Sequence, residues 1–280
     1  MSYKDLLVHI DDTRGCPRRI DAAIRLASSH GAHLDGVYVT PEPQISGYVG
    51  LYLTPEIMAT VAQEAGARAD RALADFREAA ERAGIAFGTR IERGPDPDMP
   101  DLIGLHARYA DLVILGQVDD EDPASRHPNL PERVVLGSGR PVLVVPYIGA
   151  GPTIGERVTI AWDASREAAR AVSDAMPLLE MARSVAVVSV NPRSGPSGHG
   201  EEPGADIGAH LARHGVKVEV HRLEARDIDT ANVILSHLAD AGSDLLVMGC
   251  YGHSRLRETV LGGVTRTILH DMTVPVLMAH

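Results

Sequence analysis

The sequence predicts an α/β fold built from two tandem doubly wound parallel-sheet domains, each with five strands. Apolar runs alternate with helical patterns along the chain, which is typical of such sheets. The apolar runs are continuous, as expected for strands covered on both faces. The whole pattern occurs twice within 280 residues, and an apolar content of 44% is enough for a core in each copy.

The first copy opens with an apolar run over residues 5–10 that leads into Asp11, and the second opens with a run over 157–162 that leads into Asp163. Later runs end at Gly116 and Gly249, and each copy closes on an apolar run after a proline. Each copy therefore reads β-α-β-α-β-α-β-α-β. We expect domains at residues 1–148 and 156–280, joined by a segment rich in Gly and Pro.

Composition limits the partners and the compartment. Acidic residues outnumber basic ones, 38 to 27, and the formal net charge is -11, which argues against nucleic acid and anionic membranes as partners. No apolar run approaches the roughly 18 residues of a membrane helix. The N-terminus lacks the pattern of a signal peptide, and two cysteines without metal-type spacing suit a reducing compartment. We expect a cytoplasmic protein.

Doubly wound sheets bind ligands beyond the carboxyl ends of their strands. In the second copy that place carries Gly249-x-x-Gly252, then nine residues, then Gly262 and Gly263, followed by a helical pattern. Glycines between a buried strand and a helix let backbone N–H groups approach an anion at the positive end of the helix dipole. The spacing predicts a phosphate site, although such a motif alone is also common in structural turns.

The first copy departs from this pattern. Aligned on Pro141 and Pro275, its counterparts of the later glycines are Pro128 and Asn129, and an acidic run near Asp119 replaces Gly252. Proline offers no N–H and acids repel phosphate, so we expect this site to be lost. The glycines at 137 and 139 fall at a helix C-terminus in this alignment, where Gly is a normal cap. About twenty extra residues, with a helical run over 54–83, also set this copy apart.

These residues resemble the universal stress protein family in its tandem two-domain form, whose fold is similar to that of adenine nucleotide α-hydrolases. The resemblance covers nearly the whole chain, and Asp163 and the closing Pro275-Val-Leu-Met support it. In ATP-binding members, the glycine motif holds the ribose-phosphate part, and residues ending the first two strands contact the adenosine end. The resemblance implies a nucleotide site made of Asp163, Val190, Gly249, Gly252, Gly262, Gly263, Val264 and Thr265.

One departure weakens this implication. Gly263 stands where family members carry Ser or Thr, so only its backbone N–H is available there, and Thr265 lies one turn further on. The expected cofactor is ATP, with Mg²⁺ carried by the nucleotide and no metal site made by side chains. No catalytic constellation is present, so ATP hydrolysis is at most slow.

Several readings stay open. Asp163 is a ligand contact or a helix cap, and Asp11 is expected only to cap. Cys250 is expected to be partly exposed, as a small loop residue or a redox sensor. The function is nucleotide-dependent regulation or protection in a stress response. The alternatives are a nucleotide-independent scaffold and a slow ATPase.

The partners follow the same resemblance. Single-domain family members pair through their last strands, so residues 142–146 and 274–279, which begin at Val142 and Val274, are expected to pair within one chain as a pseudo-dimer. This pairing also protects both strand edges from aggregation. A homodimer of the whole chain is left open, as are the downstream partner and the stress signal.

Overall fold

A computed structural model describes residues 2–42, 54–192, 202–251 and 263–280 of the chain. The elements of the first domain are β1 (Asp5–Ile10), α1 (Cys16–His30), β2 (His33–Glu42), α3 (Pro55–Ala83), β3 (Phe87–Pro95), a short 3-10 helix (Asp96–Asp98), α4 (Met99–Ala107), β4 (Leu112–Gly116), α5 (Leu130–Ser138) and β5 (Val142–Val145). The elements of the second domain are β6 (Arg157–Ala161), α6 (Arg166–Leu179), β7 (Ser184–Val190), α7 (Ala205–Arg213), β8 (Val218–Leu223), α8 (Thr230–Ala241), β9 (Leu245–Gly249), α9 (Gly263–Asp271) and β10 (Val276–Ala279).

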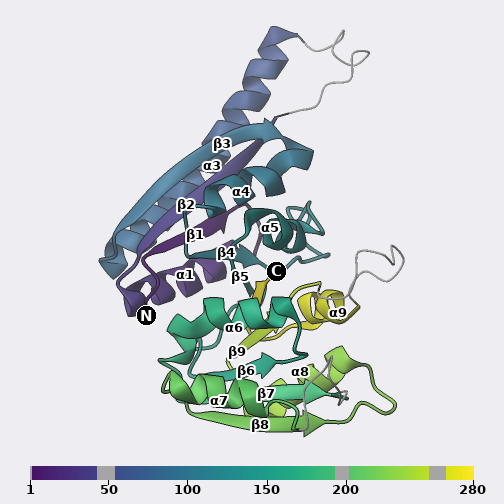
Figure 1. The fold of residues 1–280 in the computed structure, drawn as a ribbon. Helices are drawn as coiled ribbons and strands as arrows, with labels where there is room; N and C mark the ends of the chain where they lie inside the picture. The colour runs from purple at the N-terminus through teal and green to yellow at the C-terminus, as the bar shows by residue number, and fades with distance from the viewer. Residues whose placement is uncertain (1, 43–53, 193–201, 252–262) are drawn as a thin grey trace.

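The described strands form one sheet in the order β3-β2-β1-β4-β5-β10-β9-β6-β7-β8. Each domain contributes five parallel strands, and β5 and β10 meet antiparallel at the centre (Figure 1). The predicted fold class, two tandem doubly wound domains of five parallel strands each, is therefore confirmed.

Two apolar cores lie on opposite faces of the sheet, and each extends through both domains. Because successive side chains of a strand point to opposite faces, Leu143 and Leu277 enter the core under α1, α3, α6 and α7. Val142 and Met278 enter the core under α4, α5, α8 and α9. Helices thus cover both faces, as continuous apolar strands require.

The extra segment of the first domain forms α3, the longest described helix. The Thr54 side chain caps it by accepting a hydrogen bond from the Ile57 N–H (3.4 Å), and the helix ends at Gly84, which adopts a left-handed φ of 68°. The C-terminal part buries Leu73 and Phe76 completely. The N-terminal part extends past the sheet (Figure 1), where Ile57 is 45% exposed. The predicted helix over 54–83 is confirmed.

The two domains join at β5 and β10, as expected from residues 142–146 and 274–279. Leu143 pairs with Leu277, its counterpart in the other domain, so an approximate twofold axis passes between them. The Gln117 side-chain amide donates to the carbonyls of Leu269 (3.0 Å) and His270 (2.7 Å) at the end of α9. The buried Tyr3 hydroxyl donates to the Asp174 carbonyl at 2.8 Å. Paired edges, apolar contacts and buried hydrogen bonds therefore link the domains.

None of the helices in the described ranges combines the length and the apolar character that crossing a membrane demands.

Candidate functional site

The carboxyl ends of β6, β7 and β9 lie side by side in the second domain. Ala161 at the end of β6 is in register with Val188 on β7 and with Met248 on β9. The chain proceeds from β6 to β7 on one side and returns through β9 on the other, so the strand order switches between β6 and β9. In open α/β sheets this switch is where ligands bind.

Asp163 lies in the exposed turn that follows β6. Its carboxylate accepts a hydrogen bond from the Ser165 N–H at 3.0 Å, and the Ser165 hydroxyl accepts one from the Ala168 N–H at 3.1 Å. Ser165 is therefore the residue that caps α6, not Asp163. By accepting this bond, the Asp163 carboxylate stabilises the turn between β6 and α6.

Val190 ends β7 half-buried and packs against the core under α8 and α9. The next residue, Asn191, connects this edge to the segment after β8. Its side-chain amide donates to the Ala225 carbonyl at 3.0 Å and its side-chain oxygen accepts from the Ala225 N–H at 3.0 Å. These two hydrogen bonds hold the end of β7, beside Val190, against the segment that follows β8.

Gly249 ends β9 where the first turn of α6 comes closest. A Cβ at this position would lie 2.5 Å from the Ala168 nitrogen and 2.7 Å from the Glu167 carbonyl carbon, so only glycine allows the approach. Cys250 follows and is completely buried, with its N–H donating to the Ala279 carbonyl at 2.9 Å. The expectation that Cys250 is partly exposed was wrong, because β10 and α5 enclose it. Burial, with Glu132 nearby, raises the pKa of its thiol.

Backbone strain is concentrated at this edge. Among the described residues, three that are not glycine have positive φ: Ala164 (60°), Asn191 (46°) and Tyr251 (59°). They follow β6, β7 and β9 respectively. A left-handed conformation is unfavourable for residues with a Cβ, and such strain persists at functional sites where the surroundings enforce it.

The N-terminus of α9 brings the last motif residues to the same edge. Gly263 begins the helix, and a Cβ there would have no described atom within 4 Å; Val264 is half-buried, and Thr265 is buried at 4% exposure. Because Thr265 is buried, its hydroxyl is less available to a ligand than the sequence suggested. Gly252 and Gly262 lie outside the described residues.

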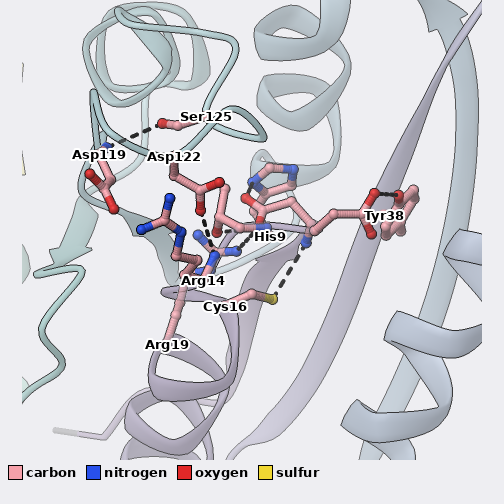
Figure 2. A network of polar contacts seen from close by, with 11 residues as sticks. His9, Arg14, Cys16, Arg19, Tyr38, Asp119, Asp122 and Ser125 are labelled. Carbon is pink, nitrogen blue, oxygen red and sulfur yellow. Dashed lines mark hydrogen bonds and ion pairs between the residues drawn. The ribbon is translucent and has the colours of Figure 1, made fainter.

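The equivalent edge of the first domain is filled by its own side chains (Figure 2). The buried Arg19 guanidinium lies 2.8 Å from the Asp11 carboxylate, and the buried His9 ring lies 3.5 Å from it. The Thr13 hydroxyl donates to the same carboxylate at 2.5 Å. The expectation that Asp11 caps α1 was therefore wrong, because its carboxylate instead forms an ion pair with the buried Arg19.

The acidic segment after β4 folds over this pair. The Asp122 carboxylate accepts from the Arg14 N–H at 2.6 Å, and the Arg14 guanidinium donates to the Glu121 carbonyl at 2.8 Å. Within the segment, the Ser125 hydroxyl accepts from the Asp119 N–H at 3.2 Å (Figure 2). Residues Glu121 and Asp122, which fall in the gap between the aligned motif glycines, thus hold the segment against the start of α1.

The glycines that end β4 and β9 have different neighbours. A Cβ on Gly116 would lie 2.2 Å from an Arg19 side-chain nitrogen, whereas a Cβ on Gly249 would meet helix backbone. In the first domain a charged side chain therefore covers the strand end. In the second domain the helix itself does.

The pKa shifts of Asp11 and His9 agree with a buried cluster in which Asp11 and Arg19 are a charged pair. Burial alone would raise the pKa of Asp11, but Arg19, His9 and the Thr13 hydroxyl hold it well below its usual value. Burial lowers the pKa of His9 to about 4, against the opposing effect of Asp11. At neutral pH the cluster therefore contains a charged pair and a neutral imidazole.

Sequence reasoning missed Arg19. The signal was present, because Cys16, Ile20 and Ala23 form the buried stripe of α1 and Arg19 falls on it. A cation on an apolar stripe needs a buried partner, and Asp11 is one of the two acids that follow β1 and precede the helix.

The end of α5 matches its prediction. Gly139 follows the helix with a left-handed φ of 69° and caps its C-terminus, and Gly137 lies in the last turn of α5. They lie at the negative end of the helix dipole, which disfavours phosphate.

Within the described parts of the chain, no three or more His, Cys, Asp or Glu side chains are grouped so that they could hold a metal ion.

The fold defines a class of protein: tandem doubly wound α/β domains, here with the described positive-φ residues other than glycine grouped at the carboxyl strand edge of one domain. The model of the universal stress protein family matches residues 2–146 and again residues 155–280. The chain therefore belongs to the universal stress protein family, in its tandem two-domain form.

Relatives agree with this assignment. Universal stress protein Slr1230 of Synechocystis sp. (strain ATCC 27184 / PCC 6803 / Kazusa) is 25% identical, with 98% of this chain and 99% of the relative covered. A universal stress protein from Archaeoglobus fulgidus DSM 4304 superposes with a TM-score of 0.74 at 16% identity, covering 98% and 95% of the two chains. A putative universal stress protein from Pseudomonas aeruginosa UCBPP-PA14 gives 0.59 at 17% identity, covering 99% and 93%. These structures share the fold.

Proposed function

We propose that the second domain binds one adenine nucleotide, which is ATP with Mg²⁺ bound to its phosphates. The first domain binds none. The observation that carries the proposal is the grouping of Ala164, Asn191 and Tyr251, the three positive-φ residues, at the ends of adjacent strands in one domain. Strain of this kind is retained where a binding surface requires it.

The roles follow the positions of the side chains. Asp163 and Val190 end the two strands beside the switch and would contact the sugar and base. The N-terminus of α9, with the N–H groups of its first turn and its positive dipole end, would face the phosphates. The phosphate residues are Gly249, Gly252, Gly262, Gly263, Val264 and Thr265.

The first domain would act as a scaffold. The Arg19–Asp11 pair and the segment held by Asp122 occupy the edge where a nucleotide would otherwise lie. In this proposal, the nucleotide state of the second domain biases the shape or the partner choice of a cytoplasmic stress-response protein.

Calorimetry with ATP and Mg²⁺ tests this function on nucleotide-stripped protein. Gly263→Asp is the diagnostic variant, because no described residue lies within 4 Å of a Cβ there and the added carboxylate would repel phosphate. Asn129→Asp is its matched control, since Asn129 holds the equivalent place before α5. We expect one ATP per chain, loss of binding in Gly263→Asp and unchanged binding in Asn129→Asp.

No binding heat from the parent protein would refute the nucleotide function and leave a nucleotide-independent scaffold. That alternative is favoured by the closed first-domain edge and by Gly263 in the hydroxyl position. Two ATP per chain would refute the asymmetry between the domains.

A further inference from the structure

Two histidines of the second domain meet between the last strand of the sheet and a helix. His221 lies on β8, which is the edge strand, and His237 lies on α8 (Figure 1). Their ring centroids are 5.5 Å apart, and the ring planes are inclined by 53°. Both side chains are partly buried. No helix or strand spacing relates the two positions, so only the fold brings the rings together.

The alternation of side chains along β8 explains which of them face α8. A Cβ on Gly208 of α7 would lie 3.1 Å from the Val220 side chain, so Val220 points towards α7. Successive side chains of a strand point to opposite faces, so Glu219 and His221 point towards α8. The Glu219 carboxylate lies 3.5 Å from Nε2 of His221. A carboxylate therefore accompanies the histidine pair on the same face of the strand.

One ring nitrogen of this pair has no partner. Nε2 of His237 is shielded from solvent and forms no hydrogen bond with any described residue. Such a nitrogen is unfavourable for folding alone. Burial and the neighbouring His221 lower the pKa of His237, and Asp240 of the same helix opposes the shift. At neutral pH the His237 ring is therefore neutral, which is the form of imidazole that binds metal ions.

We propose that His221 and His237 together bind one Zn²⁺ ion. A tetrahedral zinc ion held by two imidazole nitrogens at about 2.0–2.1 Å places the ring centroids about 5 Å apart, which agrees with the observed separation. Glu219 contacts Nε2 of His221 and leaves Nδ1 for the ion. Carboxylates commonly orient a zinc-binding histidine through its other nitrogen in this way.

The ion would keep its remaining positions for water, because the described ranges contain no group of three or more His, Cys, Asp or Glu side chains that could hold a metal. The expectation that side chains make no metal site came from spacing in the sequence. Spacing cannot show a pair that a strand and a helix bring together. The site includes none of the residues proposed to bind the nucleotide, so it does not depend on that function.

A second histidine pair in this domain provides the comparison. His210 and His214 lie one turn apart at the end of α7, with ring centroids 4.8 Å apart. Both residues are exposed, so water can satisfy their ring nitrogens. The pair therefore matches His221 and His237 in separation but lacks a shielded nitrogen without a partner.

A bound ion would connect β8 to the rest of the domain. Among the described strands β8 pairs with β7 alone, and none of its residues is fully buried. A ligand that binds only the folded chain stabilises it by mass action. Zn²⁺ should therefore raise the midpoint of thermal unfolding and slow amide hydrogen exchange in β8.

Calorimetry with Zn²⁺ on the untagged, metal-stripped full chain tests the site, in the absence of nucleotide. His221→Gln and His237→Gln should each lose one equivalent of bound Zn²⁺ and the Zn²⁺-dependent protection of β8. Glu219→Gln should keep that equivalent but weaken it about tenfold to a hundredfold. Mg²⁺ should give no protection of β8, because it prefers oxygen ligands. His214→Gln is the matched control and should retain the protection.

Three results would overturn the inference. The first is a parent protein that binds no Zn²⁺. The second is protection of β8 that is lost in His214→Gln and kept in His221→Gln, which would assign the ion to α7. The third is an affinity that neither His221→Gln nor Glu219→Gln changes. If His237→Gln does not fold, these two variants still decide, since the His221 and Glu219 side chains are 40% and 82% exposed.

Discussion

The two domains share one fold but complete their carboxyl strand edges differently. In the first, Arg19 covers the strand end and pairs with Asp11 inside the protein. In the second, the same edge is formed by backbone, with Gly249 against helix α6 and three residues in strained conformations. A duplicated scaffold can therefore keep its strands and helices while its two copies differ at the same edge, with a buried ion pair in one and close backbone contacts in the described part of the other.

The largest expected effect comes from breaking the buried pair of the first domain. Arg19→Met should lower the free energy of unfolding by about 3–5 kcal/mol, because it leaves the Asp11 carboxylate buried without a counter-ion. Urea denaturation measures this. Arg82→Met is the matched control, since Arg82 pairs with Glu78 and the two side chains are 70% and 74% exposed, and it should change stability by less than about 1 kcal/mol. A loss below about 1 kcal/mol for Arg19→Met would mean that the pair is not buried.

A second test uses pH. The folded pKa of His9 is about 4 and its unfolded pKa is about 6.5, so the unfolded chain binds the proton first as the pH falls. The stability from neutral His9 is therefore present above about pH 6.5 and is lost by about pH 4, a difference of about 3 kcal/mol. Denaturation across this range should show the loss, and His9→Gln should remove that share of it. Equal slopes for parent and variant would contradict the burial of a neutral His9.

The third test addresses the strand-end glycine of the second domain. Gly249→Ala should lower the free energy of unfolding by about 2 kcal/mol, because its Cβ would meet helix backbone that cannot move aside cheaply. Gly66→Ala is the control, since nothing lies within 4 Å of a Cβ in the middle of α3, and it should raise stability by about 0.5–1 kcal/mol. Thermal unfolding that responds equally to both changes would show that Gly249 is not packed as described.

The smallest expected effect concerns the strained turn after β6. Ala164→Gly should raise the free energy of unfolding by about 0.5–1 kcal/mol, since glycine adopts the left-handed conformation of Ala164 (φ 60°) without penalty. Ala239→Gly in the exposed part of α8 should lower it by about 1 kcal/mol. Opposite signs in chemical denaturation support the strain, whereas a loss in both variants would remove strain as a distinction between the domains.

Much of the fold follows from local sequence. Continuous apolar runs predicted the strands, whereas the resemblance to the family predicted which strands pair at the centre. The alignment placed Gly139 at a helix C-terminus although a glycine-rich stretch suggests a phosphate loop. These successes depend on patterns that a strand or helix imposes on its own residues.

The site was less predictable, because its details depend on contacts between distant segments. The burial of Cys250 depends on β10 and α5, and the surroundings of Glu132 depend on helices from two domains. Asp11 and Asp163 follow equivalent strands but differ in partner, since Arg19 has no charged counterpart in α6. Charge balance across a fold is a three-dimensional property that one strand pattern does not contain.

The antiparallel joint between β5 and β10 has a consequence for how this chain varies. In a symmetric homodimer every substitution appears on both sides of the interface, so Glu opposite Arg at equivalent positions is forbidden. Here Glu132 and Arg266 occupy such positions on one polypeptide, and each is free to change alone. The covalent link also keeps the halves at a high effective concentration, so that their pairing does not weaken on dilution. Fusion thus converts a symmetric contact into one that can differ between its two sides.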